Sequence, residues 1–349
     1  MGIPCTRTTG LPVPCSSQRA FLPLTVVDRV SKGCLRSSCE VEPVKDDGGP
    51  TLTAYSSGAE QGADSELTWA PTLFSMLSND PVRRDQIDVD GTMLSYLTAG
   101  TSSGIPLLLL HGTFWSRVWQ PVLPALGEVA RCFALDLPGF GASGGELEVE
   151  QASVPALART VLQAADALGL DEFDLAGHDI GGGIAQHIAA TSGRVGRLVL
   201  MNSVMFDSWP VPAVERFRDP QVRDATTVED MLKGRTTSTR GSVLRELSDE
   251  ELTDYLSPWR DPARVRSWTA MAAAADPKYT KDLVPALQEL ALPTRLVWGR
   301  DDDFQKIGFA HRYVKMIPGA DLVEVNGKHI PTEDSPDDIA EAIIEHLTR

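Results

Sequence analysis

Hydrophobic and polar residues alternate around an Asp-Gly pair where the patterned part of the chain begins. Ile87 and Val89 precede Asp90-Gly91, and apolar residues recur from Met93 to Leu97. An Asp-Gly pair between two such runs is typical of a two-residue β-hairpin turn. The sequence therefore predicts an antiparallel hairpin near Gln86.

Short apolar runs alternate with segments of helical periodicity after this hairpin. Strands of this kind are buried on both faces, and the helices between them act as crossover connections. We therefore predict an α/β fold with a mostly parallel, twisted sheet flanked by helices. The expected strands are Pro106–Leu110, Cys132–Leu135, Phe173–Ala176, Val195–Met201, Thr294–Trp298 and Asp321–Val325, and the expected helices include Val154–Leu168 and Gly182–Ala190.

The alternation is interrupted once, between Met201 and Thr294. A segment of this length without secondary structure is uncommon inside a domain. Its apolar residues instead favour helices, at Ala213–Phe217, Val228–Lys233, Ser248–Leu256 and Pro262–Ala275. We expect an α/β core formed by residues 65–202 and 291–349, with residues 203–290 inserted as a helical cap.

Residues 1–64 differ in composition from the rest of the chain. They are rich in Ser, Thr, Gly and Pro and show no sustained periodicity, which is typical of a disordered extension. A short amphipathic helix is expected near residues 66–78. Four of the five cysteines lie before residue 40, and their spacing does not match a metal site, so we expect reduced thiols.

The net charge excludes several classes of partner. The 349 residues carry a formal net charge of −16, which disfavours nucleic acid and anionic lipid as partners. No apolar run near the motifs approaches the roughly 20 residues that a membrane-spanning helix needs. The sequence therefore favours a cytoplasmic protein without a membrane span, and its oligomeric state is left open.

An ionisable residue lies between glycines after the third of these strands. Asp179 stands in Gly177-His178-Asp179-Ile180-Gly181, which has the glycine–x–nucleophile–x–glycine form of a nucleophile elbow between a strand and a helix. Glycine is needed in this sharp turn because neighbouring backbone approaches closely. Taken alone, the pattern also fits a helix N-cap.

The other parts of such a site occur in the order that the elbow scheme requires. An acid and then a histidine must follow the nucleophile. Asp301 and Asp302 follow the strand that ends at Trp298, and His329 follows the last strand. The backbone amides of Thr113 and Ile180 are candidate oxyanion-hole donors. The sequence thus predicts a hydrolase-type site.

From about Gln86 to the C-terminus the chain resembles the α/β-hydrolase fold superfamily, within it the branch with an aspartate nucleophile that includes epoxide hydrolases and haloalkane dehalogenases. The resemblance implies that Asp302 is the acid, with Asp301, Asp303 and, less strongly, Asp207 as alternatives. The matching segments are His111-Gly112, Asp136–Gly141, Gly177–Gly182, Trp298–Asp302 and His329.

An aspartate nucleophile implies chemistry at an sp³ carbon. An aspartate carboxyl group ordinarily has a pKa of about 3.9, so it is ionised at neutral pH and attacks such a carbon without a base. The product is an alkyl ester of Asp179, and His329, oriented by Asp302, activates the water that hydrolyses it. This mechanism requires neither a metal nor an organic cofactor.

The residues around the nucleophile favour an epoxide over a halide. Dehalogenases of this branch typically bind the halide through a Trp after the nucleophile and often an Asn in the HG-x turn, whereas this chain has Ile180 and Thr113 there. Tyr255 and Tyr279 in the cap are candidate acids for an epoxide oxygen. Phe114 departs from the epoxide-hydrolase pattern, which has proline at that position.

The expected activity is therefore hydrolysis of a small apolar epoxide to a diol. One alternative is a haloalkane dehalogenase or another carbon–heteroatom hydrolase. A second is a ligand-binding protein or a non-hydrolytic biosynthetic enzyme on the same scaffold, since fold alone does not decide function. Phe114, Trp115 and Trp209 are candidate pocket residues, although ordinary packing is as strongly expected for each of them.

Overall fold

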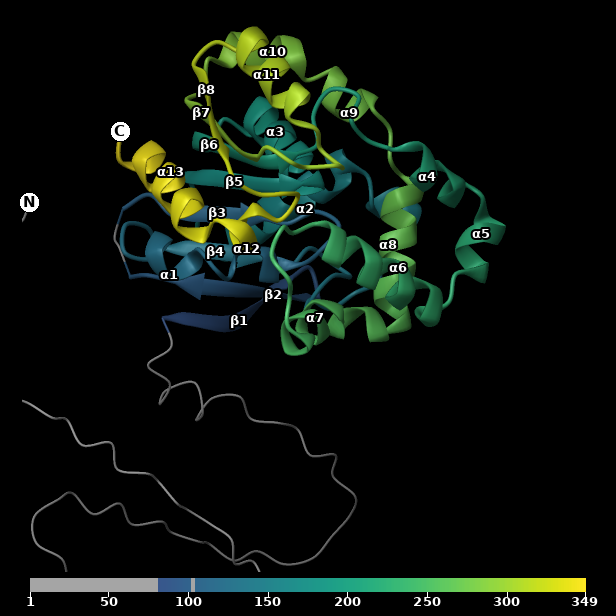
Figure 1. Ribbon diagram of the computed structural model, residues 1–349. Coiled ribbons are helices and arrows are strands. Elements are labelled where there is room, and N and C mark those ends of the chain that lie inside the picture. Colours follow the sequence, from purple (N-terminus) through teal and green to yellow (C-terminus); the bar gives the residue numbers. More distant parts are fainter. Residues whose placement is uncertain (1–80, 102–103) are drawn as a thin grey trace, which may run out of the picture. The chain divides into compact units, whose positions relative to one another are not determined.

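The structure of the protein is a computed structural model that describes residues 81–101 and 104–349 (Figure 1). The expected N-terminal extension and the expected helix at residues 66–78 lie outside the described residues. So do four of the cysteines, while Cys132 is a buried free thiol.

Eight strands form one sheet in the order β1-β2-β4-β3-β5-β6-β7-β8. β1 and β2 are antiparallel to their neighbours, and the strands from β4 to β8 are parallel. The prediction of a mostly parallel sheet is confirmed. The strands are β1 (Val82–Val89), β2 (Thr92–Ala99), β3 (Leu107–Leu110), β4 (Cys132–Leu135), β5 (Phe173–Asp179), β6 (Val195–Ser203), β7 (Thr294–Gly299) and β8 (Ala320–Val325).

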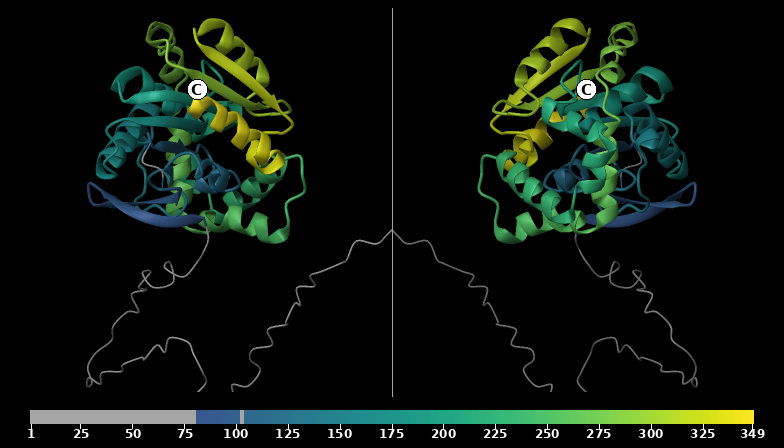
Figure 2. Two further views of the ribbon diagram at one scale, coloured as in Figure 1. Left: turned by 90° about the vertical axis from the view of Figure 1, so that its left-hand side faces the viewer. Right: turned by 90° about the vertical axis from the view of Figure 1, so that its right-hand side faces the viewer.

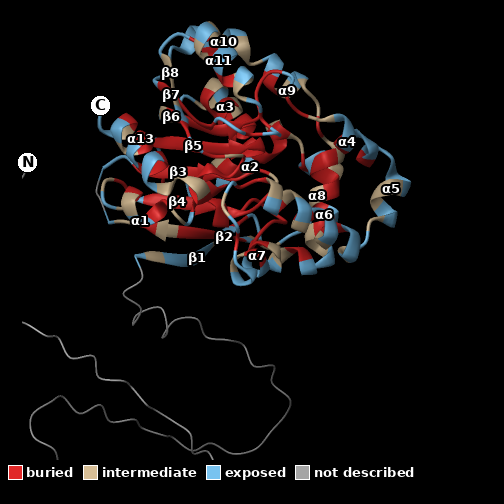
Figure 3. Ribbon diagram, in the orientation of Figure 1, coloured by how far each residue is buried: buried red, intermediate tan, exposed pale blue. Residues whose placement is uncertain are grey.

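The predicted hairpin joins β1 to β2. Val89 pairs with Thr92, and the two residues between them, Asp90 and Gly91, have φ angles of 50° and 82°. Both positive values are what a type I′ turn requires, which explains the Asp-Gly pair. β1 forms the edge of the sheet and is largely exposed (Figure 3).

Helices cover both faces of the sheet (Figures 1 and 2). α1 (Leu123–Leu126) and α13 (Pro336–Thr348) contact one face, and α2 (Val154–Ala167), α3 (Ile180–Ser192) and α11 (Ile307–Met316) contact the other. Residues of β3 alternate between two hydrophobic cores, one on each face of the sheet. Leu107 and Leu109 pack in the core with α1 and α13, and Leu108 and Leu110 pack in the core with α2 and α3. An unbroken apolar strand is therefore required there.

The insert between β6 and β7 is helical, as its length indicated. α9 and α10 contact α3 of the core, and α6 contacts both α7 and α8. Its helices are α4 (Pro212–Glu215), α5 (Pro220–Ala225), α6 (Val228–Gly241), α7 (Asp249–Leu256), α8 (Pro262–Ala273), α9 (Lys278–Lys281) and α10 (Val284–Leu290). Short 3₁₀ turns occur at Ser116–Trp119, Val149–Gln151, Arg216–Arg218 and Ser257–Arg260, and α12 (Pro331–Asp334) precedes α13.

Two expected boundaries were wrong by three residues or more. α6 continues to Gly241 instead of ending at Lys233, because tertiary packing of Met231, Arg235 and Thr239 overrides the low helix propensity of its Gly and Thr residues. β5 continues through His178 to Asp179, because β6 pairs with it up to Ser203. Within the described ranges, no helix combines the length and the hydropathy needed to cross a membrane.

The elbow between β5 and α3 depends on close backbone contact. A Cβ at Gly177 would lie 2.5 Å from the carbonyl oxygen of Gly181 and 2.6 Å from the Cα of Gly182. Both neighbours are backbone atoms, so no side-chain rotation relieves the contact. Gly234 lies in the middle of α6, and a Cβ added there would have no atom within 4 Å. It therefore offers a matched comparison.

Gly177→Ala is expected to lower the free energy of unfolding by about 1–3 kcal/mol or more, because the added methyl group overpacks the elbow. Gly234→Ala is expected to raise it by about 0.5–1 kcal/mol, because alanine has the higher helix propensity. Thermal unfolding followed by circular dichroism separates the two variants. A melting temperature of Gly177→Ala equal to that of the unaltered protein would show that the elbow is not tightly packed.

Candidate active site

Asp179 lies at the junction of β5 and α3 in a conformation that most residues avoid. Its φ angle is 55° and its ψ angle is −124°, and the residue is 3% exposed. Strain of this kind persists only where the surrounding structure enforces it, and it is frequent at functional sites. The elbow that the glycine pattern predicted is therefore formed, with the carboxylate inside the protein.

Thr113 holds one oxygen of this carboxylate. Its backbone amide donates to Asp179 Oδ2 at 2.9 Å, and its hydroxyl donates to the same oxygen at 2.8 Å. A Cβ at the preceding Gly112 would lie 2.6 Å from Oδ2 and 2.5 Å from the amide nitrogen of Ile180. Glycine at position 112 therefore lets the loop after β3 approach the carboxylate of Asp179 and the amide of Ile180.

His329 and Asp302 lie beside the carboxylate. His329 Nδ1 is 2.9 Å from Asp302 Oδ2, and His329 Nε2 is 3.8 Å from Asp179 Oδ2. Asp302 Oδ1 accepts the backbone amides of Phe304 and Gln305 at 2.7 and 3.0 Å. Because a carboxylate held this way accepts the Nδ1 proton, Nε2 is the nitrogen that faces Asp179.

The charges of this cluster stabilise one another. Burial alone would lower the pKa of His329, but the negative charges of Asp302 and Asp179 raise it well above its usual value. Burial alone would raise the pKa of Asp179, but His329, His178 and the amide of Thr113 lower it overall. The geometry therefore favours an ionised Asp179 beside a protonated His329 at neutral pH.

His178 supports the loop that carries His329. Its Nε2 lies 2.7 Å from the carbonyl oxygen of His329, and burial together with the nearby charge of His329 lowers its pKa to about 4. A neutral His178 therefore donates its Nε2 proton to that carbonyl. This hydrogen bond joins the elbow to the loop that carries His329.

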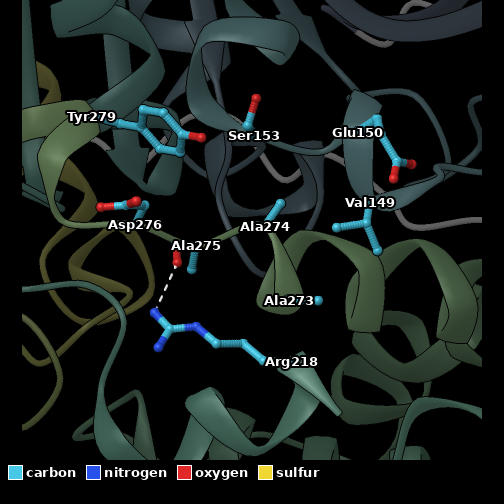
Figure 4. Close-up of a pocket in the computed structure, with 9 residues that line it drawn as sticks. All are labelled: Val149, Glu150, Ser153, Arg218, Ala273, Ala274, Ala275, Asp276 and Tyr279. Carbon is cyan, nitrogen blue, oxygen red and sulfur yellow. Dashed lines mark hydrogen bonds between the residues drawn. The ribbon is translucent and has the colours of Figure 1, made fainter. Parts of the chain in front are cut away.

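Among the described residues, no contact joins either of the two tyrosines proposed as acids to Asp179. Tyr255 is fully buried, and its hydroxyl donates to Glu333 at 2.7 Å rather than toward the nucleophile. Tyr279 lines a pocket of about 500 Å³ beside Ser153, Arg218 and Asp276 (Figure 4). Neither the lining residues of this pocket nor the interactions drawn within it include Asp179.

The three candidate pocket residues differ in position. Phe114 borders the site, since its ring centroid is 6.2 Å from that of His329. Trp115 donates through Nε1 to the backbone carbonyl of Tyr255 at 3.3 Å and lines a second surface pocket. Trp209 is buried in the core on the α2 and α3 face. Of these three, Phe114 is the one with a ring contact to His329 among the described residues.

Sequence reasoning missed two residues of this region. Asn202 has a φ angle of 42° and donates through Nδ2 to Asp302 Oδ2 at 2.7 Å. Arg235 is buried on α6 with its guanidinium 5.5 Å from the ring centroid of Phe114. Helical spacing was the available signal for Arg235, because Met231, Arg235 and Thr239 share one face, but the expected helix ended too early to show it.

Comparison with known proteins bears on this site. A family model described as "Alpha/beta hydrolase family" matches residues 107–342. Haloalkane dehalogenase 2 of Mycobacterium tuberculosis is 28% identical over 270 residues, covering 73% of this chain and 91% of the relative. A 2-hydroxy-6-oxononadienedioate/2-hydroxy-6-oxononatrienedioate hydrolase of Dechloromonas aromatica is 27% identical over 281 residues, covering 73% and 90%.

A solved structure extends the likeness to three dimensions. The haloalkane dehalogenase DbeA from Bradyrhizobium elkani is 25% identical and has a TM-score of 0.65, with 76% of this chain and 98% of that chain covered. The resemblance drawn from the motifs is confirmed by these matches, whereas the relatives differ in the reactions that their names state. The chain belongs to the alpha/beta hydrolase family, and its likeness to haloalkane dehalogenases supports the branch with an aspartate nucleophile.

Proposed function

We propose that the protein hydrolyses a carbon–halogen bond at an sp³ carbon through an alkyl ester of Asp179. One observation carries the proposal: a buried carboxylate at the elbow has a histidine–acid pair beside it, with Nε2 of His329 3.8 Å from Asp179 Oδ2. A carboxylate nucleophile serves alkyl transfer well and ordinary ester cleavage poorly. The dehalogenase names among the relatives also support this choice.

The two oxygens of Asp179 have different surroundings and so different proposed roles. Oδ2 accepts both hydrogen bonds from Thr113, while Oδ1 accepts none from the residues that the structure describes. Oδ1 therefore attacks the carbon and forms the new C–O bond as the carbon–halogen bond breaks, and the halide leaves with the bonding pair. Oδ2 becomes the carbonyl oxygen of the ester, already placed against the amide of Thr113.

The second step requires a neutral histidine. In the free enzyme, the negative charges of Asp179 and Asp302 hold the pKa of His329 high. Ester formation neutralises Asp179, which removes one of these charges and lowers the pKa of His329. His329 then releases its Nε2 proton to solvent, and the neutral ring accepts a proton from the water that attacks the ester carbonyl. Collapse of the tetrahedral intermediate releases the alcohol and regenerates the carboxylate.

Epoxide hydrolysis is the second candidate, since Ile180 has no side-chain donor for a halide and the hydroxyl of Thr113 already donates to Asp179. An alkoxide, however, is a strong base that needs a proton as it leaves, whereas a halide leaves as a stable anion. The hydroxyl of Tyr255 donates to Glu333, and Tyr279 lines a different pocket. Carbon–halogen cleavage therefore needs no proton donor for the leaving group, whereas epoxide opening needs one.

His329→Gln is expected to form the ester and then stop, because glutamine cannot accept the proton of the attacking water. Incubation with bromoalkanes, 2-bromobutanoate and epoxides, followed by intact-protein and peptide mass spectrometry, should show one alkyl adduct on Asp179. The exposed His311 gives the control His311→Gln, which should turn over without accumulating the adduct. Absence of an adduct with every substrate would reject covalent catalysis by Asp179.

Asp302→Asn is expected to lower the pKa of His329 by about 1–3, because an adjacent negative charge is lost. Imidazole ¹⁵N shifts recorded against pH measure this pKa directly. Asp301→Asn is the matched control, since Asp301 is exposed and its side chain has no recorded contact with His329 among the described residues. Equal responses of the two variants would mean that Asp302 is not the acid that acts on His329.

A further inference from the structure

Arg235 lies in a cluster of aromatic rings between the insert and the core. Its Cζ is 4.3 Å from the ring centroid of Trp259, 4.9 Å from that of Trp268 and 5.5 Å from that of Phe114. The residue is 6% exposed. Rings at these distances stabilise a guanidinium through their negative faces, but they accept no ordinary hydrogen bond from its N–H groups.

The guanidinium has no polar partner within the described part of the chain. No carboxylate is recorded within 4 Å of it, no hydrogen bond is recorded from its side chain, and its Nη2 is fully buried without an acceptor. Arg117 and Arg295 are also buried, yet each forms ion pairs with two carboxylates. Trp268, whose ring lies under Arg235, likewise has a buried Nε1 without an acceptor.

An unpaired buried cation is costly to the fold. Removing a charge from water costs several kcal/mol unless a counterion or hydrogen bonds replace the water. Burial accordingly lowers the pKa of Arg235 to about 9, and the negative charge of Asp179 acts in the opposite direction. A local feature that costs stability is most often found where function requires it.

The position of Arg235 connects it with the active site. It contacts Phe114, the residue after Thr113, and Phe114 borders His329. The nucleophile is also the acidic group whose charge acts on Arg235. Ester formation neutralises Asp179, so that Arg235 would then lack a nearby counterion unless the substrate brings one.

We propose that Arg235 binds a carboxylate group of the substrate, with Trp268 Nε1 as a second donor, so that the substrates are short haloalkanoates. This inference rests on the proposed function. A planar guanidinium with unused N–H groups matches a carboxylate through two parallel hydrogen bonds. Asp179 Oδ1 bonds to the carbon that bears the halogen, the halide departs with the bonding pair, and hydrolysis of the ester yields a hydroxyalkanoate and a proton.

Binding of unreactive analogues tests the proposal without chemistry. Butanoate and butanamide have nearly the same shape and differ in charge, and quenching of tryptophan fluorescence reports binding beside Trp259 and Trp268. The full-length protein should bind butanoate at least about tenfold more tightly than butanamide. Arg235→Gln should lose this preference, whereas Arg240→Gln, an exposed arginine on the same helix, should keep it.

Turnover of 2-bromobutanoate and 2-bromobutanamide tests the same charge during the reaction. Arg235→Gln should lower the ratio of their kcat/KM values by about 30-fold or more, in the range typical of truncating one partner of a buried charge pair. Arg240→Gln should leave the ratio unchanged. Arg235→Met should melt at or above the temperature of the unaltered protein, because it removes an unpaired charge, which separates lost binding from lost folding.

The outcomes separate this inference from the proposed function. If His329→Gln forms an adduct but butanoate and butanamide bind alike, the carboxylate site is refuted and the covalent mechanism stands. If bromide ion binds in an Arg235-dependent way and butanoate does not, Arg235 holds the leaving group and the inference is overturned. If butanoate binding depends on Arg235 but no substrate forms an adduct, only the proposed reaction fails.

Discussion

The site depends on a carboxylate that is held inside the protein at a strained turn. Asp179 adopts a positive φ angle and is almost inaccessible to solvent. Burying such a charge costs several kcal/mol, and the surrounding residues offset that cost. Thr113 donates two hydrogen bonds to one oxygen, and His329 supplies a positive charge nearby. The glycines around the elbow let these groups approach.

The same charge links the core to the insert. Asp179 and Asp302 stabilise the protonated form of His329, and Asp179 also acts on the buried cation of Arg235. Under the proposed mechanism, ester formation changes both relationships at once, because it makes His329 a better base and leaves Arg235 in need of a counterion. Binding of the substrate by Arg235 and activation of water by His329 would therefore both depend on the charge of Asp179.

Much of this arrangement was predictable because its signals are local. The hairpin at Asp90-Gly91 and the apolar runs of the parallel strands follow from backbone geometry and burial, and the elbow follows from its glycines. Arg235 was missed because the expected helix ended at Lys233, before the spacing of Met231, Arg235 and Thr239 could mark a buried face. The partner of Tyr255 was also hidden, since Glu333 lies 78 residues away in the chain.

A single turnover in H₂¹⁸O tests the central claim, that Asp179 carries the reacting group as an ester. Because water attacks the carbonyl carbon of that ester, one atom of ¹⁸O should enter the carboxylate of Asp179. The first equivalent of alcohol should carry an unlabelled oxygen taken from Asp179. Peptide and product mass spectrometry measure both. Label in the first alcohol, with none in Asp179, would mean that water attacks the substrate directly and would contradict the account.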